Sequence, residues 1–393
     1  MRTAPMAAGA FLVCSLFTTG GPLDARRYGD VHVYAHYAHA MTSGRWPYRD
    51  FFDEYPPLAQ PLFLFVKLLP GSFASAFTWT MAVLGALTVA VVVITLERLG
   101  ANRSHTAAAA ATGAASPLAA GPFLFHHYDL FAALLVGAAV LALVTRRETA
   151  GYVLLGLGVA AKVYPLAILP VALIRTWKRD RSAVARRSAA FGAAVLAAHL
   201  PFLVVAPGGV RFSYWVQLKR GLHVESLGGI SLLAGDKLGL HQAVLQDQAP
   251  GGKNVLGGVA GAFATATSVV EVVAVVLVAW LLWKKGGSLV LAAAAAVAGA
   301  LAFGKVFSPQ YVVWLIPLVP LTGVVPCAFL LAIEGLTHVS YGRYGAAASA
   351  TRAGLISQIV WVDLARDFLV VALYALLVAR LSRGRWQPRR RPA

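Results

Sequence analysis

The sequence has few charged residues. Asp, Glu, Lys and Arg make up 13% of its 393 residues, while hydrophobic residues make up 59%. A soluble domain usually carries about 25% charged residues. With half that share, the chain cannot cover a surface that faces water. The shortage of charge excludes a soluble enzyme, a disordered chain and a coiled coil, and it predicts a protein with many membrane-spanning helices.

Cysteines and acidic residues are also scarce. The two cysteines, Cys14 and Cys327, lie in apolar stretches, which predicts small buried side chains and no disulfide framework. The 16 acidic residues are outnumbered by 34 Lys and Arg, which gives a formal net charge of +18. In a soluble protein this excess would suggest a nucleic-acid partner. In a membrane protein it indicates which side of the bilayer each loop occupies.

Apolar runs long enough to cross a bilayer recur along the chain, since a spanning helix needs about 20 such residues. About twelve spans are predicted, at 5–22, 74–96, 104–121, 128–145, 149–162, 163–177, 188–206, 258–283, 287–303, 309–322, 324–340 and 356–381. The apolar segment 57–70 is too short to cross easily and predicts an interfacial or re-entrant helix. The expected fold class is all-α, with residues 1–393 forming one integral membrane domain.

Basic residues cluster in the short links between these spans. The links at 97–103, 146–148, 175–187 and 284–285 and the basic tail 382–393 fall on one side if the N-terminus is cytoplasmic. The positive-inside rule assigns that side to the cytoplasm. The long loops 23–57 and 207–257 then face the outside of the cell membrane. Because topology accounts for the basic charge, we expect no nucleic-acid partner.

The first external loop carries acidic and aromatic residues with helical spacing. Asp30 is placed to cap or begin a helix that runs to about Met41. Asp30, Tyr34 and Tyr37 share one face of that helix. Further aromatic residues follow at Trp46, Tyr48, Phe51, Phe52 and Tyr55. The pattern favours an amphipathic loop at the outer membrane interface, and its acid could be a simple helix cap or part of a site.

Ionisable residues near the outer ends of spans are a second set of candidates, because charge at membrane depth is costly and often functional. Lys162 and Lys305 are each followed by an aromatic residue and a proline. Each could contact a lipid phosphate, and snorkelling toward water is the alternative. Arg211 and Arg220, in the second external loop, suit phosphate binding or contact with anionic headgroups.

Two clusters of ionisable residues have structural interpretations. Three imidazoles share one helix face by their spacing: His32, His36 and His39. They could bind a metal, but no acidic partner motif accompanies them, and we expect no metal. Asp363, Arg366 and Asp367 lie within two turns of the last span, and their spacing predicts mutual pairing.

A family resemblance appears when the first loop is taken as one motif, Gly29-Asp30-x3-Tyr34-x9-Gly44-x2-Pro47-Tyr48-x-Asp50-Phe51-x2-Glu54-Tyr55-Pro56-Pro57-Leu58. It resembles the first extracytoplasmic loop of glycosyltransferase family 87, which are membrane enzymes of the GT-C fold, best known as mannosyltransferases of actinobacteria. Further similar pieces are Asp129-Leu-x-Ala-Ala-Leu-Leu, Lys162-Val-Tyr-Pro-Leu, Arg220-x3-Val224-Glu225-Ser226 and Ser308-Pro-Gln-Tyr-x2-Trp.

The resemblance implies a hexosyltransferase. The expected sugar is mannose, carried by a polyprenyl phosphate and passed to a glycolipid or glycan acceptor on the extracytoplasmic face, with inversion at the anomeric carbon. Asp30 matches the acidic loop residue that serves the family as general base or as the group that orients the acceptor. The lipid-linked sugar is a substrate, so no cofactor is expected.

Roles for the other matched residues follow from the same chemistry. Because the leaving group is a phosphate, cations would stabilise it. The candidates to bind the donor phosphate are Lys162, Lys305, Arg211 and Arg220. The candidates to contact the substrates are Tyr34, Tyr48, Asp50, Glu54, Tyr55, Asp129, Glu225 and Gln310.

A multi-span transporter or lipid flippase is the alternative, because many spans with charges in them are also typical of transporters. Transporters often consist of two related halves, and the sequence shows no internal repeat.

Overall fold

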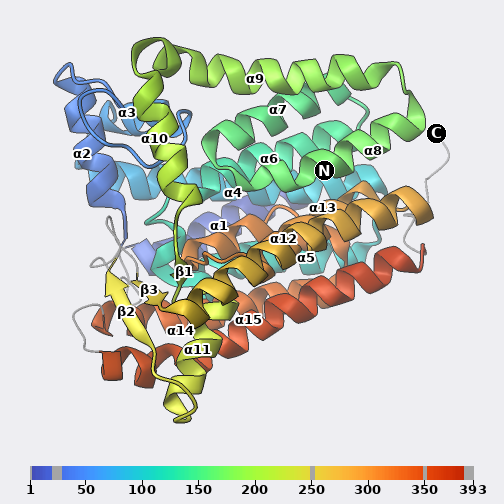
Figure 1. The fold of residues 1–393 in the computed structure, drawn as a ribbon. Helices are drawn as coiled ribbons and strands as arrows, with labels where there is room; N and C mark the ends of the chain where they lie inside the picture. The colour runs from blue at the N-terminus through green and yellow to red at the C-terminus, as the bar shows by residue number, and fades with distance from the viewer. Residues whose placement is uncertain (1, 20–28, 248–252, 348–351, 385–393) are drawn as a thin grey trace.

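The computed structural model describes residues 2–19, 29–247, 253–347 and 352–384. Within them the chain forms a bundle of helices that lie roughly side by side, with shorter elements gathered at one end (Figure 1). We call the end that carries α2, α3 and α10 the loop end. Residues 20–22 of the predicted span 5–22, residues 23–28 of the first external loop and residues 385–393 of the basic tail lie outside the described residues.

The first half of the chain contains the α-helices α1 (Thr3–Thr19), α2 (Val31–Thr42), α3 (Ala59–Lys67), α4 (Phe73–Leu99), α5 (Arg103–Ala120), α6 (Asp129–Val144), α7 (Glu148–Ala161), α8 (Leu169–Arg179), α9 (Ala183–Val205) and α10 (Pro207–Leu218). Short 3₁₀-helices are η1 (Gly121–Leu124) and η2 (Tyr164–Ile168). The second half contains α11 (Leu227–Lys237), α12 (Gly258–Lys285), α13 (Leu289–Phe303), η3 (Pro309–Leu315), η4 (Val319–Thr322), α14 (Val324–Ala347) and α15 (Arg352–Ser382).

The mostly helical fold confirms the general prediction for the chain. On length and composition alone, four helices among the described residues could cross a membrane: α4, α9, α12 and Val324–Gly342 of α14. Shorter apolar helices are Thr3–Thr18, Asp129–Val144, Glu148–Ala161, Leu289–Phe303 and Pro309–Thr322. The total number of membrane spans, about twelve, stays a prediction. So does the position of α3 at the membrane interface.

The segment 309–322, expected as one spanning helix, is instead two 3₁₀-helices, η3 and η4. It contains Pro309, Pro317 and Pro320, each of which lacks the backbone N–H that an α-helix interior needs. The segment is nevertheless buried within the bundle. Here the apolar composition correctly predicted burial, while the prolines decided the local geometry.

The second external loop is more ordered than expected and corrects the all-α class. It forms α10, α11 and a three-stranded antiparallel sheet in the order β1-β3-β2. The strands are β1 (Leu222–His223), β2 (Val244–Asp247) and β3 (Lys253–Leu256). Leu222 pairs with Val255, which in turn pairs with Leu245. The sheet and α11 lie together at the loop end of the bundle (Figure 1).

Small residues allow the helices of the core to approach closely. The side chains of Ala292–Ala296 on α13 are all fully buried. A Cβ atom on Gly156 of α7 would lie 2.6 Å from the carbonyl oxygen of Phe191 on α9. This agrees with the expectation that small residues support close packing of membrane helices. In contrast, α12 exposes Val272 and Val276 on its outer face, where lipid would cover them.

Candidate functional site

A cavity of about 290 Å³ lies at the loop end of the bundle. We call it the outer cavity. Its wall comes from segments far apart in the sequence: residue 30, residues 54–56, residue 128 and residues 162–164, with parts of 213–220 and 308–314. The fold therefore brings together pieces of several segments that lie at this end.

Asp30 lines the outer cavity with its carboxylate. The residue is at the N-cap position of α2, as expected, but its side chain makes no capping hydrogen bond. Instead, Oδ2 accepts hydrogen bonds from the hydroxyls of Tyr34, at 3.3 Å, and Tyr55, at 3.1 Å. Nε2 of His127 lies 3.8 Å from the same oxygen. The side chain keeps 31% of its surface exposed, so the carboxylate is oriented but accessible.

An aromatic cluster fixes the position of these hydroxyls. The Tyr34 ring is buried and stacks on Phe63 with centroids 4.5 Å apart. It meets Tyr55 and Tyr128 edge-on at 5.3 and 5.6 Å. The backbone N–H of Leu58 donates to the carbonyl oxygen of Ala160 and so joins the first external loop to the end of α7. The loop that carries Asp30 is thus held by packing.

Lys162 is the first residue beyond α7 and places its ammonium on the cavity wall. Nζ lies 3.0 Å from Oδ2 of Asp129 and 4.4 Å from the Tyr128 ring centroid. Oδ1 of Asp129 accepts the indole N–H of Trp314 at 2.6 Å. Asp129 is buried behind Lys162 and does not line the outer cavity. It therefore positions the lysine and is not placed to contact a substrate directly.

Three stacked rings form another part of the wall. Tyr164 and Trp314 stack with centroids 4.3 Å apart, and Trp314 and Tyr311 stack at 4.0 Å. The prolines that start η2 and η3 set these short turns. Gln310 lines the cavity beside Tyr311. Flat rings beside polar groups are suited to binding an amphipathic molecule such as a sugar.

A third group of polar side chains joins the first loop to α10. Nε2 of Gln217 donates to Oε2 of Glu54 at 3.2 Å, and Nη1 of Arg220 donates to Oε1 of Gln217 at 3.4 Å. Burial raises the pKa of the Glu54 carboxyl, and the nearby negative charge of Asp30 raises it further, while Arg220 opposes both. Glu54, Gln217 and Arg220 all line the outer cavity.

A glycine lets α10 reach the first loop. A Cβ atom on Gly209 would lie 1.9 Å from the carbonyl oxygen of Tyr48, so no larger residue fits there without moving the backbone. Tyr48 itself has a positive φ of 67° and is buried. Its hydroxyl donates to the carbonyl oxygen of Tyr55. Tyr48 therefore supports the loop from behind and does not line the cavity.

Two of the four predicted phosphate-binding cations lie elsewhere. Arg211 is exposed on α10, and Lys305 donates from Nζ to the carbonyl oxygen of Leu218 at 2.9 Å. Neither lines the outer cavity. Their positions in the sequence correctly predicted the loop end of the bundle. The sequence could not predict whether each side chain would face the outer cavity.

Asp50 is also outside the cavity. It forms an ion pair with Arg49 at 2.8 Å and accepts the backbone N–H of Trp46 at 2.7 Å. The hydrogen bond from Arg49 lowers the pKa of the Asp50 carboxyl to about 2. The residue therefore stabilises a surface turn, and the predicted substrate contact is not supported by its position.

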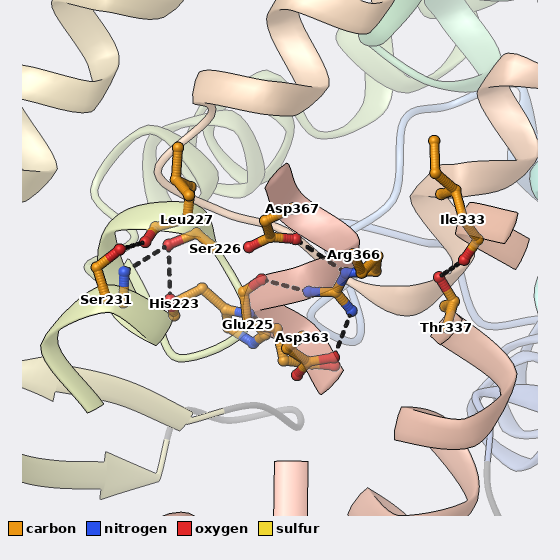
Figure 2. A network of polar contacts seen from close by, with 11 residues as sticks. His223, Glu225, Ser226, Leu227, Ser231, Ile333, Thr337, Asp363, Arg366 and Asp367 are labelled. Carbon is orange, nitrogen blue, oxygen red and sulfur yellow. Dashed lines mark hydrogen bonds and ion pairs between the residues drawn. The ribbon is translucent and has the colours of Figure 1, made fainter. Parts of the chain in front are cut away.

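Glu225 belongs to a buried network centred on Arg366 (Figure 2). The guanidinium lies 2.9 Å from Oδ1 of Asp363 and 2.9 Å from Oδ1 of Asp367, and Nη2 donates to the carbonyl oxygen of Glu225 at 2.7 Å. This confirms the predicted pairing within α15. The network attaches the segment that follows Arg220 to α15. Glu225 does not line the outer cavity, and its contact with a substrate stays a prediction.

Of the predicted residues, the outer cavity brings together six: Asp30, Glu54, Tyr55, Lys162, Arg220 and Gln310. The predictions overlooked Tyr128, Gln217, Tyr311 and Trp314. Tyr311 and Trp314 are part of the motif that begins at Ser308, so a signal was present. Gln217 has no comparable signal. Across the described residues, no group of three or more His, Cys, Asp or Glu could hold a metal ion.

Comparison with known proteins gives two results. The model of glycosyltransferase family 87 matches residues 52–309. The fold is similar to the crystal structure of ArnT from Cupriavidus metallidurans bound to undecaprenyl phosphate, with a TM-score of 0.52 and 14% sequence identity over 97% of this chain and 77% of that one. At this identity the likeness concerns the fold. No curated protein matches the sequence.

Proposed function

Because the chain belongs to glycosyltransferase family 87, we propose that it transfers a hexosyl group, mannose, from a polyprenyl phosphate to a hydroxyl of a glycolipid or glycan. Membership of this family makes the protein a glycosyltransferase and decides against the transporter or flippase alternative. Our proposal goes further and names the donor, the sugar, the acceptor and the residues that take part in the reaction.

The observation that carries the proposal is that Asp30, Lys162 and Arg220 line one cavity. A base for the acceptor hydroxyl and cations for a phosphate are the groups that this reaction needs. Tyr34 and Tyr55 orient the Asp30 carboxylate, and Asp129 orients the Lys162 ammonium. Both charges are thus held in place before any substrate arrives.

The proposed reaction is a single displacement. The acceptor oxygen attacks the anomeric carbon and its proton passes to the Asp30 carboxylate. The bond from the anomeric carbon to the phosphate oxygen breaks, and its electron pair leaves with the polyprenyl phosphate. Lys162 and Arg220 stabilise the negative charge that develops there. Attack opposite the leaving group inverts the anomeric carbon, so a β-linked mannosyl phosphate gives an α-mannoside.

A lipid-linked donor is supported by the surroundings of the outer cavity. Val163 and Leu218 line it and expose 46% and 74% of their surfaces. Such apolar surface next to Lys162 and Arg220 suits a polyprenyl tail whose phosphate reaches the cations. The similar fold of ArnT, whose crystal structure contains undecaprenyl phosphate, supports the same class of donor.

The proposed location follows from the distribution of charge. With both termini in the cytoplasm, the basic links obey the positive-inside rule and the outer cavity faces the extracytoplasmic side of the cell membrane. No cofactor or metal takes part in the proposed reaction, since the phosphate is already a good leaving group.

The test is a transfer assay with the purified full-length protein in lipid nanodiscs. Radiolabelled polyprenyl-phosphate mannose is incubated with a membrane lipid extract, and the same lipid carrying glucose or arabinose is compared. We expect label from the mannose donor to enter lipid or glycan product. Transfer from another sugar donor alone would overturn the choice of mannose. Transfer only from nucleotide sugars would overturn the donor class.

A further inference from the structure

A second cavity, of about 350 Å³, lies at the far end of α6 and α7 from the outer cavity. α6 begins at Asp129, behind Lys162, and ends at Val144, which lines the second cavity. The 16 residues of α6 extend about 24 Å at 1.5 Å per residue. The two cavities are therefore separate sites on opposite sides of the bundle.

Four of the ten residues that line this second cavity are cationic, and the others are apolar residues or glycines. Its charged residues are Arg146, Arg175, Lys178 and Arg179. We call it the basic cavity, because none of the acidic residues that the structure describes lines it. Glu148 lies 2.7 Å from Arg179 and 3.6 Å from Arg187, so its one negative charge is shared. The cavity keeps an excess of positive charge that suits an anion.

The backbone around the basic cavity is shaped by left-handed turns. Arg146 has a φ of 66°, which is uncommon for a residue other than glycine, and it follows the end of α6. Gly286 and Gly287 end α12 with φ values of 72° and 124°. A Cβ atom on Gly286 would meet nothing within 4 Å. The wall formed by Gly286 is therefore open enough for a ligand atom to approach the backbone.

Exposed tryptophans lie beside the basic cavity. Trp177 on α8 and Trp283 on α12 expose about two-fifths of their surfaces, and their ring centroids are 6.4 Å apart. Nζ of Lys178 lies 5.8 Å from the Trp283 ring centroid and donates to the carbonyl oxygen of Leu282 at 3.0 Å. Tryptophan is enriched where lipid headgroups meet water. The cations and the tryptophans thus indicate a ligand that is part of the membrane surface.

We propose that the basic cavity binds the phosphate-bearing headgroup of an anionic phospholipid, in the leaflet opposite to the outer cavity. Arg146 and Arg175 bind the phosphate oxygens, which suit guanidinium groups. Trp177 and Trp283 lie at the level of the glycerol backbone, and the acyl chains follow the apolar face of α12. Basic cavities between membrane helices on the cytoplasmic side are suited to anionic lipids. This site is independent of the transfer reaction.

The test is native mass spectrometry of the full-length protein, released from detergent and titrated with phosphatidylglycerol or phosphatidylcholine. We expect phosphatidylglycerol to bind at least tenfold more tightly. Arg146→Asn removes one cation at a position where Asn tolerates a positive φ, and it should weaken phosphatidylglycerol binding about fivefold. Arg103→Asn, at an exposed arginine that begins α5 outside the cavity, is the matched control and should bind as the wild type does.

A second variant keeps the proposal testable if Arg146→Asn does not fold. Arg175→Gln removes the second guanidinium from the wall of the basic cavity without a change of backbone conformation, and it should also weaken binding about fivefold. Equal binding of the two lipids, or equal loss in the Arg103 control, would overturn the proposal. Displacement of the lipid by inorganic phosphate at the same concentration would assign the cavity to a free anion instead.

Discussion

Lys162 Nζ lies 3.0 Å from the buried carboxylate of Asp129, which in turn accepts the indole N–H of Trp314. Asp129 is the first residue of α6, Lys162 directly follows α7, and Trp314 belongs to η3. One carboxylate thus fixes a cation and an aromatic ring from three elements on the wall of the outer cavity. We therefore expect the three residues to behave as a unit when any one is changed.

Asp30→Asn should lower transfer by about 10²- to 10⁴-fold, because the amide cannot accept the acceptor's proton. Both hydroxyls that bind Oδ2 can still donate to the amide oxygen, so folding should be retained. Steady-state transfer with the purified variant measures the effect. Asp50→Asn is the matched control, since Asp50 is in the same loop but outside the cavity. Equal losses in both variants would argue against a base at position 30.

Lys162→Ala should weaken donor binding about tenfold or more, because it removes a charged hydrogen-bond donor from the outer cavity. Lys305→Ala should leave donor affinity unchanged, because Lys305 does not line the cavity and its ammonium donates to a backbone carbonyl, that of Leu218. Titration with a non-transferable polyprenyl phosphate measures both. The assignment of the phosphate site to Lys162 fails if the two variants bind the lipid equally well.

Donor binding should strengthen as the pH falls through the raised pKa of Glu54. Above that pKa the carboxylate is negative, lies close to Arg220 and repels the donor phosphate. Protonation removes the repulsion, so the dissociation constant of the donor decreases toward lower pH. Glu54→Gln should bind the donor tightly at all pH values and lose this dependence. An unchanged pH profile in the variant would show that another group titrates.

Arg366→Met should lower the free energy of unfolding by about 3–5 kcal/mol, because it leaves the buried carboxylates of Asp363 and Asp367 without a counter-charge. Unfolding in mixed micelles with increasing dodecyl sulfate measures the loss. Combining the change with Asp363→Asn and Asp367→Asn removes the uncompensated charges and should recover much of the stability. No recovery would mean that Arg366 acts mainly through its contact with Glu225.

The sequence predicted the helices well because their apolar runs are long. It failed to predict the sheet of the second external loop because β1 has two residues and β2 and β3 have four each. Strands this short cannot show an alternating pattern that differs from a polar loop. The prolines in 309–322 did carry a signal for irregular helix, but the apolar composition suggested a regular span.

The family motif predicted the outer cavity better than spacing did. It includes Asp30, Lys162 and Gln310, which line the cavity, and also Tyr34 and Asp129, which lie directly behind it. A motif cannot separate these two groups, because a buried residue that orients a charge is as necessary as the charge itself. Asp50 shows the opposite case, a motif residue whose partners are all within a surface turn.

Two helices with an end at the outer cavity are short: α6 and α7 have 16 and 14 residues. At 1.5 Å per residue they are about 21–24 Å long, several ångströms less than the roughly 30 Å hydrocarbon core of a bilayer. This hydrophobic mismatch recesses the floor of the cavity below the headgroup level or thins the bilayer around it. On the proposed function, the acyl-chain length of the surrounding lipids sets how far the donor phosphate must descend to reach Lys162.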